Sequence, residues 1–258
     1  MKYLICLDLD GTVLNDKGEI GNELIDVIKK CKEKKYLIAF NTTRNYNRVK
    51  KYAEILKPDY INCLSGSYVA NSKEKVLFNN CIPKEMVLKI NNLIDNYKDI
   101  TLICSELTHS EMVLDKDYSL KHNKIYATKE IINNSQSCKL IYLFKDNVPT
   151  DLLNSLNNFN ITYSVSIKHK YIRIMPKTDK WEGIQLILND LSFKKIKVIS
   201  FGNDMSDFNT LINSDIGVAM SNAIEDLKSQ LPNVTEFDNN NDGVAKYLQK
   251  VILGECKK

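Results

Sequence analysis

A short apolar run that ends in two aspartates is the feature of this chain that most limits its fold. Residues Tyr3 to Leu7 are apolar, and Asp8, Asp10 and Gly11 follow at once. Such a run predicts a strand buried on both faces of a parallel sheet. Residues two apart in an extended chain point to the same side, so the two carboxylates can converge on one small volume. Gly11 permits a tight turn that leaves this volume open to a ligand.

The remainder of the chain decides whether these aspartates form a site or a solvated turn, because aspartates are common in turns. Strands and helices are predicted to alternate before and after a long middle block: 3–7, 23–34, 36–40, 46–56 and 60–64, and then 181–191, 196–201, 206–212, 216–219 and 243–252. The alternation predicts one parallel sheet with right-handed crossovers. The middle block mixes helices with antiparallel strands, and at about a hundred residues it is far too long for a loop. We therefore expect an α/β fold: a Rossmann-like parallel-sheet core, residues 1–79 and 177–258, with an inserted α+β domain, residues 80–176.

Composition places the chain among ordinary soluble proteins. Apolar residues make up 43% of it and charged residues 26%, and the net charge of +4 is spread over Lys-rich helices. Such a charge is too weak to indicate nucleic-acid binding, although it suits anionic small molecules. The N-terminus reads neither as a signal peptide nor as a membrane span, so no membrane partner and a cytoplasmic location are expected. The oligomeric state is not readable from the sequence.

The cysteines indicate neither a zinc site nor a disulfide framework. There are seven, an odd number, and no two form a C-x-x-C pair. Four of them lie in apolar, strand-like runs and are expected to be small buried core residues: Cys6, Cys63, Cys104 and Cys138. A reducing compartment fits this usage.

Polar groups suited to phosphoryl chemistry stand at four predicted element ends. Asp8 and Asp10 end the first strand, Thr42 ends the second, Lys180 opens a helix, and a late strand runs into Asn203, Asp204 and Asp207. A carboxylate can attack phosphorus directly and form an acyl phosphate that water cleaves. A second acid can shuttle protons in both steps. The anionic group in transfer calls for a cation such as Lys and for a hard metal held by oxygens.

With these residues in place, the chain resembles the haloacid-dehalogenase-like hydrolase superfamily, specifically its Cof-type phosphatases with a large α+β cap. LDLDGT matches the first motif, NTTR the second, MPKTDKWEGI the third, and SFGNDMSDFNTLINSDIGVAMSNA the fourth. The resemblance covers nearly the whole chain. It implies that the inserted domain is a cap that closes over the active site and selects the substrate.

The resemblance also implies a role for each matched residue. Asp8 would be the nucleophile and form an aspartyl phosphate, and Asp10 would be the acid and then the base. Thr42 would bind phosphoryl oxygens, and Lys180 would pair with Asp8 and the phosphoryl group. Neighbouring phosphate-site positions are Gly11, Thr43 and Ser206. Mg²⁺ would lie on the Asp8 carboxylate, the Asp10 main-chain carbonyl and oxygens of the loop that contains Asn203, Asp204 and Asp207.

The chain departs from the family pattern in its last motif. Asn203 stands where the family usually has Asp, and Ser206 stands where Asn is frequent. Asn203 can still offer a neutral oxygen to Mg²⁺, with Asp204 or Asp207 supplying charge. Which of the three provides the ligand is left open, although Asp207 is favoured as a ligand or anchor.

Three further residues have both a functional and a structural interpretation. Arg44 either contacts substrate or caps its helix, and the second is favoured. Trp181 is expected to pack its helix on the sheet. Arg173 is expected on a solvated strand face, although it could meet an anionic substrate.

The sequence predicts a magnesium-dependent phosphomonoesterase acting on small phosphorylated metabolites, such as sugar phosphates or phosphorylated cofactors. Two alternatives stay open. Related proteins use the same core as a phosphotransferase or phosphosugar mutase. Asn203 and Ser206 would instead suit a catalytically impaired binding or regulatory homologue.

Overall fold

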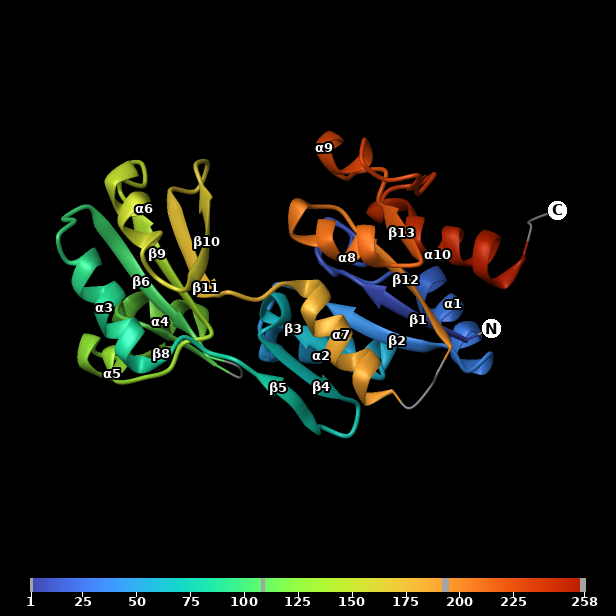
Figure 1. Ribbon diagram of the computed structural model, residues 1–258, viewed down its shortest axis with the longest axis horizontal. Coiled ribbons are helices and arrows are strands. Elements are labelled where there is room, and N and C mark those ends of the chain that lie inside the picture. Colours follow the sequence, from blue (N-terminus) through green and yellow to red (C-terminus); the bar gives the residue numbers. More distant parts are fainter. Residues whose placement is uncertain (1, 108–109, 192–194, 256–258) are drawn as a thin grey trace. The chain divides into compact units, whose positions relative to one another are not determined.

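A computed structural model describes residues 2–107, 110–191 and 195–255, and the chain divides into two compact units (Figure 1). The core unit comprises Met1–Arg44, Arg48–Phe78 and Asp179–Lys258. We refer to the second unit, which comprises Asn45–Asn47 and Asn79–Thr178, as the cap unit, after the domain that the family resemblance implies. The chain thus passes between the units at 78/79 and 178/179, where the sequence predicted 79/80 and 176/177.

The core unit is built on an eight-stranded sheet in the order β14-β13-β12-β1-β2-β3-β4-β5. Its strands are β1 (Lys2–Leu7), β2 (Leu37–Asn41), β3 (Tyr60–Cys63), β4 (Tyr68–Asn71), β5 (Val76–Asn79), β12 (Ile196–Gly202), β13 (Ile216–Ala219) and β14 (Asn233–Val234). The six strands from β14 to β3 run parallel, and β4 is antiparallel to β3. The predicted α/β class with a Rossmann-like parallel sheet is confirmed.

The central strand β1 is buried on both faces, as its apolar run predicted. Leu4 and Cys6 belong to a core cluster with Ile184 and Ile187 of a covering helix, and Trp181 packs against that cluster as expected. Because strand residues alternate, Ile5 and Leu7 face the opposite side of the sheet, where they are also fully buried. Burial on both faces fixes β1, and so fixes where the residues after it emerge.

The core unit's helices connect and cover these strands (Figure 1). They are α1 (Asn22–Glu33), α2 (Tyr46–Leu56), α7 (Lys180–Asp190), α8 (Phe208–Asn213), α9 (Glu225–Lys228) and α10 (Gly243–Tyr247), with 3₁₀ turns η1 (Leu64–Gly66), η2 (Met205–Asp207) and η3 (Asn239–Asn241) and a π-helical end η4 (Leu248–Leu253). Within the described ranges, no helix combines the length and apolar character needed to cross a bilayer.

The cap unit has its own six-stranded sheet, in the order β10-β11-β9-β6-β7-β8, with antiparallel pairs except β7 and β8. Its elements are α3 (Lys84–Ile94), β6 (Ile100–Glu106), β7 (Glu111–Val113), α4 (Lys116–His122), β8 (Ile125–Tyr126), α5 (Lys129–Asn133), β9 (Lys139–Phe144), α6 (Thr150–Leu156), β10 (Ile161–Ser166) and β11 (Tyr171–Pro176). Alternate residues of β9, namely Leu140, Tyr142 and Phe144, pack with α3 and α6 in one core. Arg173 on β11 lies over the ring of Tyr171.

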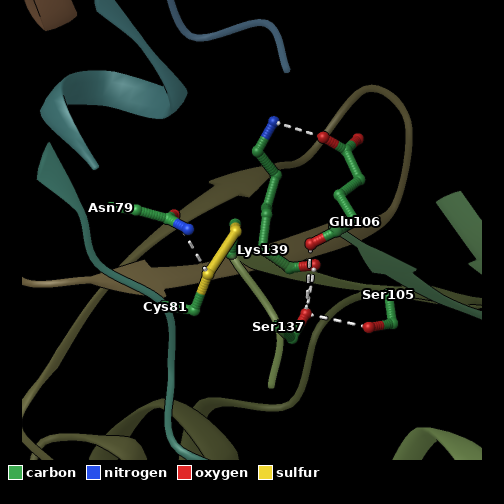
Figure 2. The surroundings of a disulfide bond; sticks show 7 residues. Asn79, Cys81, Ser105, Glu106, Ser137 and Lys139 are labelled. Atoms are coloured by element: carbon green, nitrogen blue, oxygen red, sulfur yellow. Dashed lines mark hydrogen bonds and ion pairs between the residues drawn. A yellow bond between two sulfur atoms is a disulfide. The ribbon is translucent and has the colours of Figure 1, made fainter. Parts of the chain in front are cut away.

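The sequence indicated no disulfide framework, but the structure contains a disulfide. Cys6, Cys63 and Cys138 are buried as predicted, and the side chain of Cys104 lies outside the described part of the structure. However, Cys138 is joined by a disulfide to Cys81 (Figure 2), 57 residues earlier in the chain. The two segments are also paired through main-chain hydrogen bonds between Ile82 and Ser137, which bring the sulfur atoms together. A pairing this distant in the sequence leaves no spacing signal, so it was not predicted.

Candidate active site

Strand register brings the predicted site residues to one edge of the core sheet. Leu7, the last residue of β1, is paired with Phe201 of β12 on one side and with Phe40 of β2 on the other. Asp8 therefore leaves the sheet between the ends of these two strands. The sheet extends from β1 toward β2 on one side and toward β12 on the other, so the strand order reverses here. Open α/β sheets bind their ligands at such a point.

Lys180 joins two buried carboxylates. Its Nζ lies 2.7 Å from Asp8 Oδ1 and 2.6 Å from Asp207 Oδ1, and all three side chains are at most 7% exposed. Burial disfavours charge on Lys180, but the attraction of Asp207 and Asp8 outweighs it and raises the pKa of the ammonium. Burial raises the pKa of Asp8 to about 7, with Lys180 opposing the rise and Asp207 adding to it.

The first turn of helix α7 holds the main chain of Lys180 in place. Asp179 is the N-cap: its side chain accepts hydrogen bonds from Trp181 N and Glu182 N, and Glu182 accepts in return from Asp179 N. This reciprocal capping box satisfies main-chain donors that a helix start otherwise leaves unpaired. Lys180 thus occupies the first helical position, with a main chain fixed by local sequence.

Asp207 also organises the loop that follows β12. Its Oδ2 accepts hydrogen bonds from the main-chain N–H of Asn203 at 3.0 Å and of Asp204 at 3.1 Å. Asn203 packs closely on the turn after β1, because a Cβ added to Gly11 would lie 2.4 Å from Asn203 Nδ2. Gly11 has a φ of +71°, a conformation that side chains also disfavour. Both constraints explain the glycine that follows Asp10.

Asp10 lies at the rim of the site and is paired with Arg44. Arg44 Nε donates to Asp10 Oδ2 at 2.7 Å and Nη2 donates to Oδ1 at 2.5 Å. The hydrogen bonds that Arg44 donates to Asp10 raise the pKa of the guanidinium, against the effect of its partial burial. The favoured interpretation of the Arg44 side chain as a helix cap was therefore wrong. Arg44 is itself held by Tyr52, whose hydroxyl accepts from Nη1 at 3.2 Å and whose ring lies below the guanidinium.

A cavity of about 300 Å³ opens above these groups. Its lining contains most of the predicted site residues: Asp8, Asp10, Gly11, Thr43, Lys180, Asn203, Asp204, Ser206 and Asp207. Thr42 is not in this lining. It is buried, and its Oγ1 accepts a hydrogen bond from Arg44 N at 3.2 Å. The structure therefore brings Thr43 to the cavity, whereas its neighbour Thr42 is buried.

The oxygen-rich lining fits a hard divalent cation. Four carboxylates line the cavity with a single ammonium, an excess of negative charge unsuited to a phosphate ester unless a cation is added. Among the described residues no group of three His, Cys, Asp or Glu side chains is arranged to hold a metal on its own. Mg²⁺ does not require one, because it keeps several waters and commonly takes one or two carboxylates together with substrate phosphate.

Two further polar residues near the site were not singled out in the sequence. Asn41, the last residue of β2, and Asn62, within β3, are both buried, and Asn62 Nδ2 donates to the main-chain oxygen of Lys180 at 2.8 Å. Their signal was available: an Asn inside a run that otherwise reads as a buried strand needs hydrogen-bond partners.

Comparison with known proteins agrees with this geometry. The family model described as haloacid dehalogenase-like hydrolase matches residues 5–248. A Buchnera aphidicola (subsp. Baizongia pistaciae) protein is 28% identical, covering 98% of this chain and 99% of its own. The Bacillus subtilis (strain 168) protein named 5-amino-6-(5-phospho-D-ribitylamino)uracil phosphatase YitU is 24% identical over 96% of this chain and 97% of its own.

Solved structures show the same fold. The HAD subclass IIB sugar phosphatase BT4131 superposes with a TM-score of 0.79 at 19% identity, covering 98% of this chain and all of its own. A Bacteroides thetaiotaomicron haloacid dehalogenase-like hydrolase gives a TM-score of 0.82 at 19% identity over 97% of this chain and all of its own. The family match runs from β1 to the start of η4 and so covers nearly the whole chain. This chain belongs to the haloacid dehalogenase-like hydrolases.

Proposed function

We propose that this hydrolase is a magnesium-dependent phosphomonoesterase that works through an aspartyl phosphate on Asp8. One observation carries the proposal: a buried carboxylate at the end of the central strand, with an ammonium at 2.7 Å, faces a cavity of about 300 Å³. Asp8 supplies a nucleophile in a place that little bulk water reaches. Lys180 supplies the positive charge that a transferring phosphoryl group needs.

The names of two relatives support a substrate class. YitU is named as a phosphatase of a phosphoribitylamino-uracil, and BT4131 is titled a sugar phosphatase. We propose that this chain likewise hydrolyses small phosphorylated metabolites, either sugar phosphates or phosphorylated cofactor precursors.

The proposed reaction has two steps on these residues. In the first, Asp8 attacks phosphorus, the bond from phosphorus to the leaving oxygen breaks, and Asp10 donates a proton to that oxygen. In the second, Asp10 takes a proton from water as the water attacks the aspartyl phosphate, which releases inorganic phosphate and restores Asp8. Lys180 neutralises phosphoryl charge in both steps, and Thr43 and Ser206 line the same cavity.

Mg²⁺ would add charge neutralisation to this site. Asp8 and the main-chain carbonyl of Asp10 would hold it, together with oxygens of the loop after β12. Both Asp207 oxygens are already used, one by Lys180 and one by two main-chain N–H groups. We therefore assign the remaining ligand positions to Asn203 and Asp204, with Asp207 as the anchor of the loop.

A screen of phosphorylated metabolites for released phosphate, with Mg²⁺ or with EDTA, tests the proposal. Asp8→Asn keeps the shape of the side chain and removes the nucleophile, so turnover should fall by several orders of magnitude. Asp26→Asn is the matched control, because Asp26 lies exposed on α1, where it pairs with Lys29, and is not in the cavity lining. Wild-type-like turnover in Asp8→Asn would reject the covalent mechanism.

Two other outcomes would select the alternatives. Phosphate transfer that appears only with an acceptor sugar would indicate a phosphotransferase or mutase. Binding of phosphate esters without turnover would indicate a regulatory homologue, which the neutral Asn203 favours.

A further inference from the structure

Two buried amides connect the main chain of Lys180 to neighbouring strands. Asn62 Nδ2 donates to Lys180 O at 2.8 Å and to Asn41 Oδ1 at 2.7 Å. Asn41 Nδ2 in turn donates to Thr210 Oγ1 at 3.1 Å. Asn62 is fully buried, and Asn41 and Thr210 are at most 3% exposed. The path therefore runs from α7 through β3 and β2 to α8 with almost no exposure to solvent.

These contacts close a ring with the active-site ion pairs. Thr210 stands three residues after Asp207, on the helical turn that Asp207 begins. Lys180 contacts Asp207 through its ammonium, and it contacts the far end of the amide path through its carbonyl. The ammonium and the main-chain carbonyl of Lys180 are thus both connected to the segment that carries Asp207.

The orientation of Asn62 is defined by its surroundings. Its Nδ2 faces two acceptors, whereas its Oδ1 has no hydrogen-bond partner among the described residues. The amide lies flat on Gly183, where an added Cβ would come within 2.2 Å of Oδ1. A buried oxygen without a partner lowers folding stability, so the amide is not explained by stability alone.

We propose that Asn62 and Asn41 are positioning residues that hold Lys180 between Asp8 and Asp207. The inference rests on the role of Lys180 in the proposed phosphatase reaction. Neither amide lines the cavity, so neither is expected to touch substrate. Without Asn62 the first turn of α7 keeps its capping box but loses its tie to β3, and the ammonium can move away from the two carboxylates.

The experiment compares Asn62→Ala, Asn41→Ala and the double variant in the full chain, with p-nitrophenyl phosphate as substrate. A shift of about an ångström in a catalytic group lowers rates by roughly tenfold to a hundredfold. Asn62→Ala should lower kcat within that range, and Asn41→Ala should lower it less because Lys180 O keeps its donor. The double variant should match Asn62→Ala, since both act through one path.

Thr235→Ala is the matched control. Thr235 is buried in the same unit at 3% exposure, and its hydroxyl bonds Phe237 O and Ser221 N instead of any residue around Lys180. Urea denaturation measures the free energy of unfolding of each variant, so that their stabilities can be compared. Thr235→Ala should lose stability and keep its kcat. Equal kcat in Asn62→Ala and Thr235→Ala at equal stability would overturn the inference.

A second readout does not need activity. The ¹⁵N–¹H signal of the Lys180 side-chain ammonium, assigned with Lys180→Arg, should be protected from exchange in the wild type and in Thr235→Ala. It should broaden or disappear in Asn62→Ala. If the wild type hydrolyses no phosphate ester, the proposed function fails and this signal alone decides the positioning role. An unchanged signal in Asn62→Ala would reject it.

Discussion

Arg44 binds both carboxylate oxygens of Asp10, although the two residues are 34 positions apart in the chain. Asp10 is the residue to which the proposed mechanism gives the proton transfers. A carboxylate held on both oxygens by a guanidinium is fixed in orientation. To donate a proton to a leaving group, Asp10 must release at least one oxygen from Arg44. Under the proposed mechanism, the pair in this structure is therefore the resting arrangement of the site.

The first prediction concerns the leaving group. Asp10→Asn cannot protonate an alkoxide, so it should reduce kcat on a sugar phosphate far more than on p-nitrophenyl phosphate, whose leaving group needs little protonation. A difference of about tenfold or more between the two losses is expected. Equal losses on both substrates, with chemistry rate-limiting in each, would remove Asp10 from the proton transfers.

The second prediction distinguishes two roles of Arg44, which are orienting Asp10 and contacting substrate directly. If Arg44 acts through Asp10, Arg44→Met should reduce kcat/KM in the wild type but change it by less than about twofold in an Asp10→Asn background. The measurement is a double-mutant cycle on one sugar phosphate. A full, independent loss in the second background would show that Arg44 contacts substrate directly.

The third prediction concerns pH. Because burial raises the pKa of Asp8 to about 7, much of the nucleophile is protonated below neutral pH. kcat/KM should therefore decline as pH falls through about 7, by roughly tenfold per unit once the acid form dominates. Higher Mg²⁺ should move this decline to lower pH, since a bound cation favours the carboxylate. A profile that is flat from pH 5 to 8 would contradict the assignment of Asp8.

The fourth prediction concerns the disulfide between Cys81 and Cys138. It closes a loop of 57 residues in the cap unit, so its reduction should destabilise that unit by about 2–4 kcal/mol. Thermal melts with and without dithiothreitol measure the effect. Cys81→Ser is the control, because it should melt at the reduced wild-type temperature and show no response to the reductant. Equal melting of the oxidised and reduced wild type would show that the bond does not stabilise the fold.

The fold was predictable because its signals are local. The apolar run before Asp8 and the alternation of strands and helices each depend on a few adjacent residues. Once the sheet is parallel, Asp8, Lys180 and Asp207 must meet at its carboxyl edge, so their proximity follows from topology.

The details that escaped prediction depend on side-chain direction or on distant pairing. Both Thr42 and Thr43 were predicted at the phosphate site, but the sequence could not show that Thr43 is the one that lines the cavity. Arg44 reaches Asp10 across 34 positions of the chain, and its guanidinium also contacts Tyr52. Asn41 and Asn62 could have been singled out from the sequence, since a polar residue within a buried strand is visible there even when its hydrogen-bond partner is not.

The last prediction concerns the altered metal loop. Asn203 brings no charge to the site, so a charged oxygen from this loop must come from Asp204 or Asp207. Both aspartates line the cavity, but Asp207 already accepts from Lys180 and from two main-chain N–H groups, whereas Asp204 accepts from Met205 N of its own turn. Asp204→Asn should therefore raise the Mg²⁺ concentration needed for half-maximal activity, because a hard cation loses a charged ligand. Asp207→Asn should instead lower kcat at every Mg²⁺ concentration, because Lys180 loses a carboxylate and the loop loses its anchor.

Titration of Mg²⁺ against activity distinguishes the two variants, and the reverse pattern would make Asp207 the ligand. Activity that persists in excess EDTA would remove the metal from the mechanism.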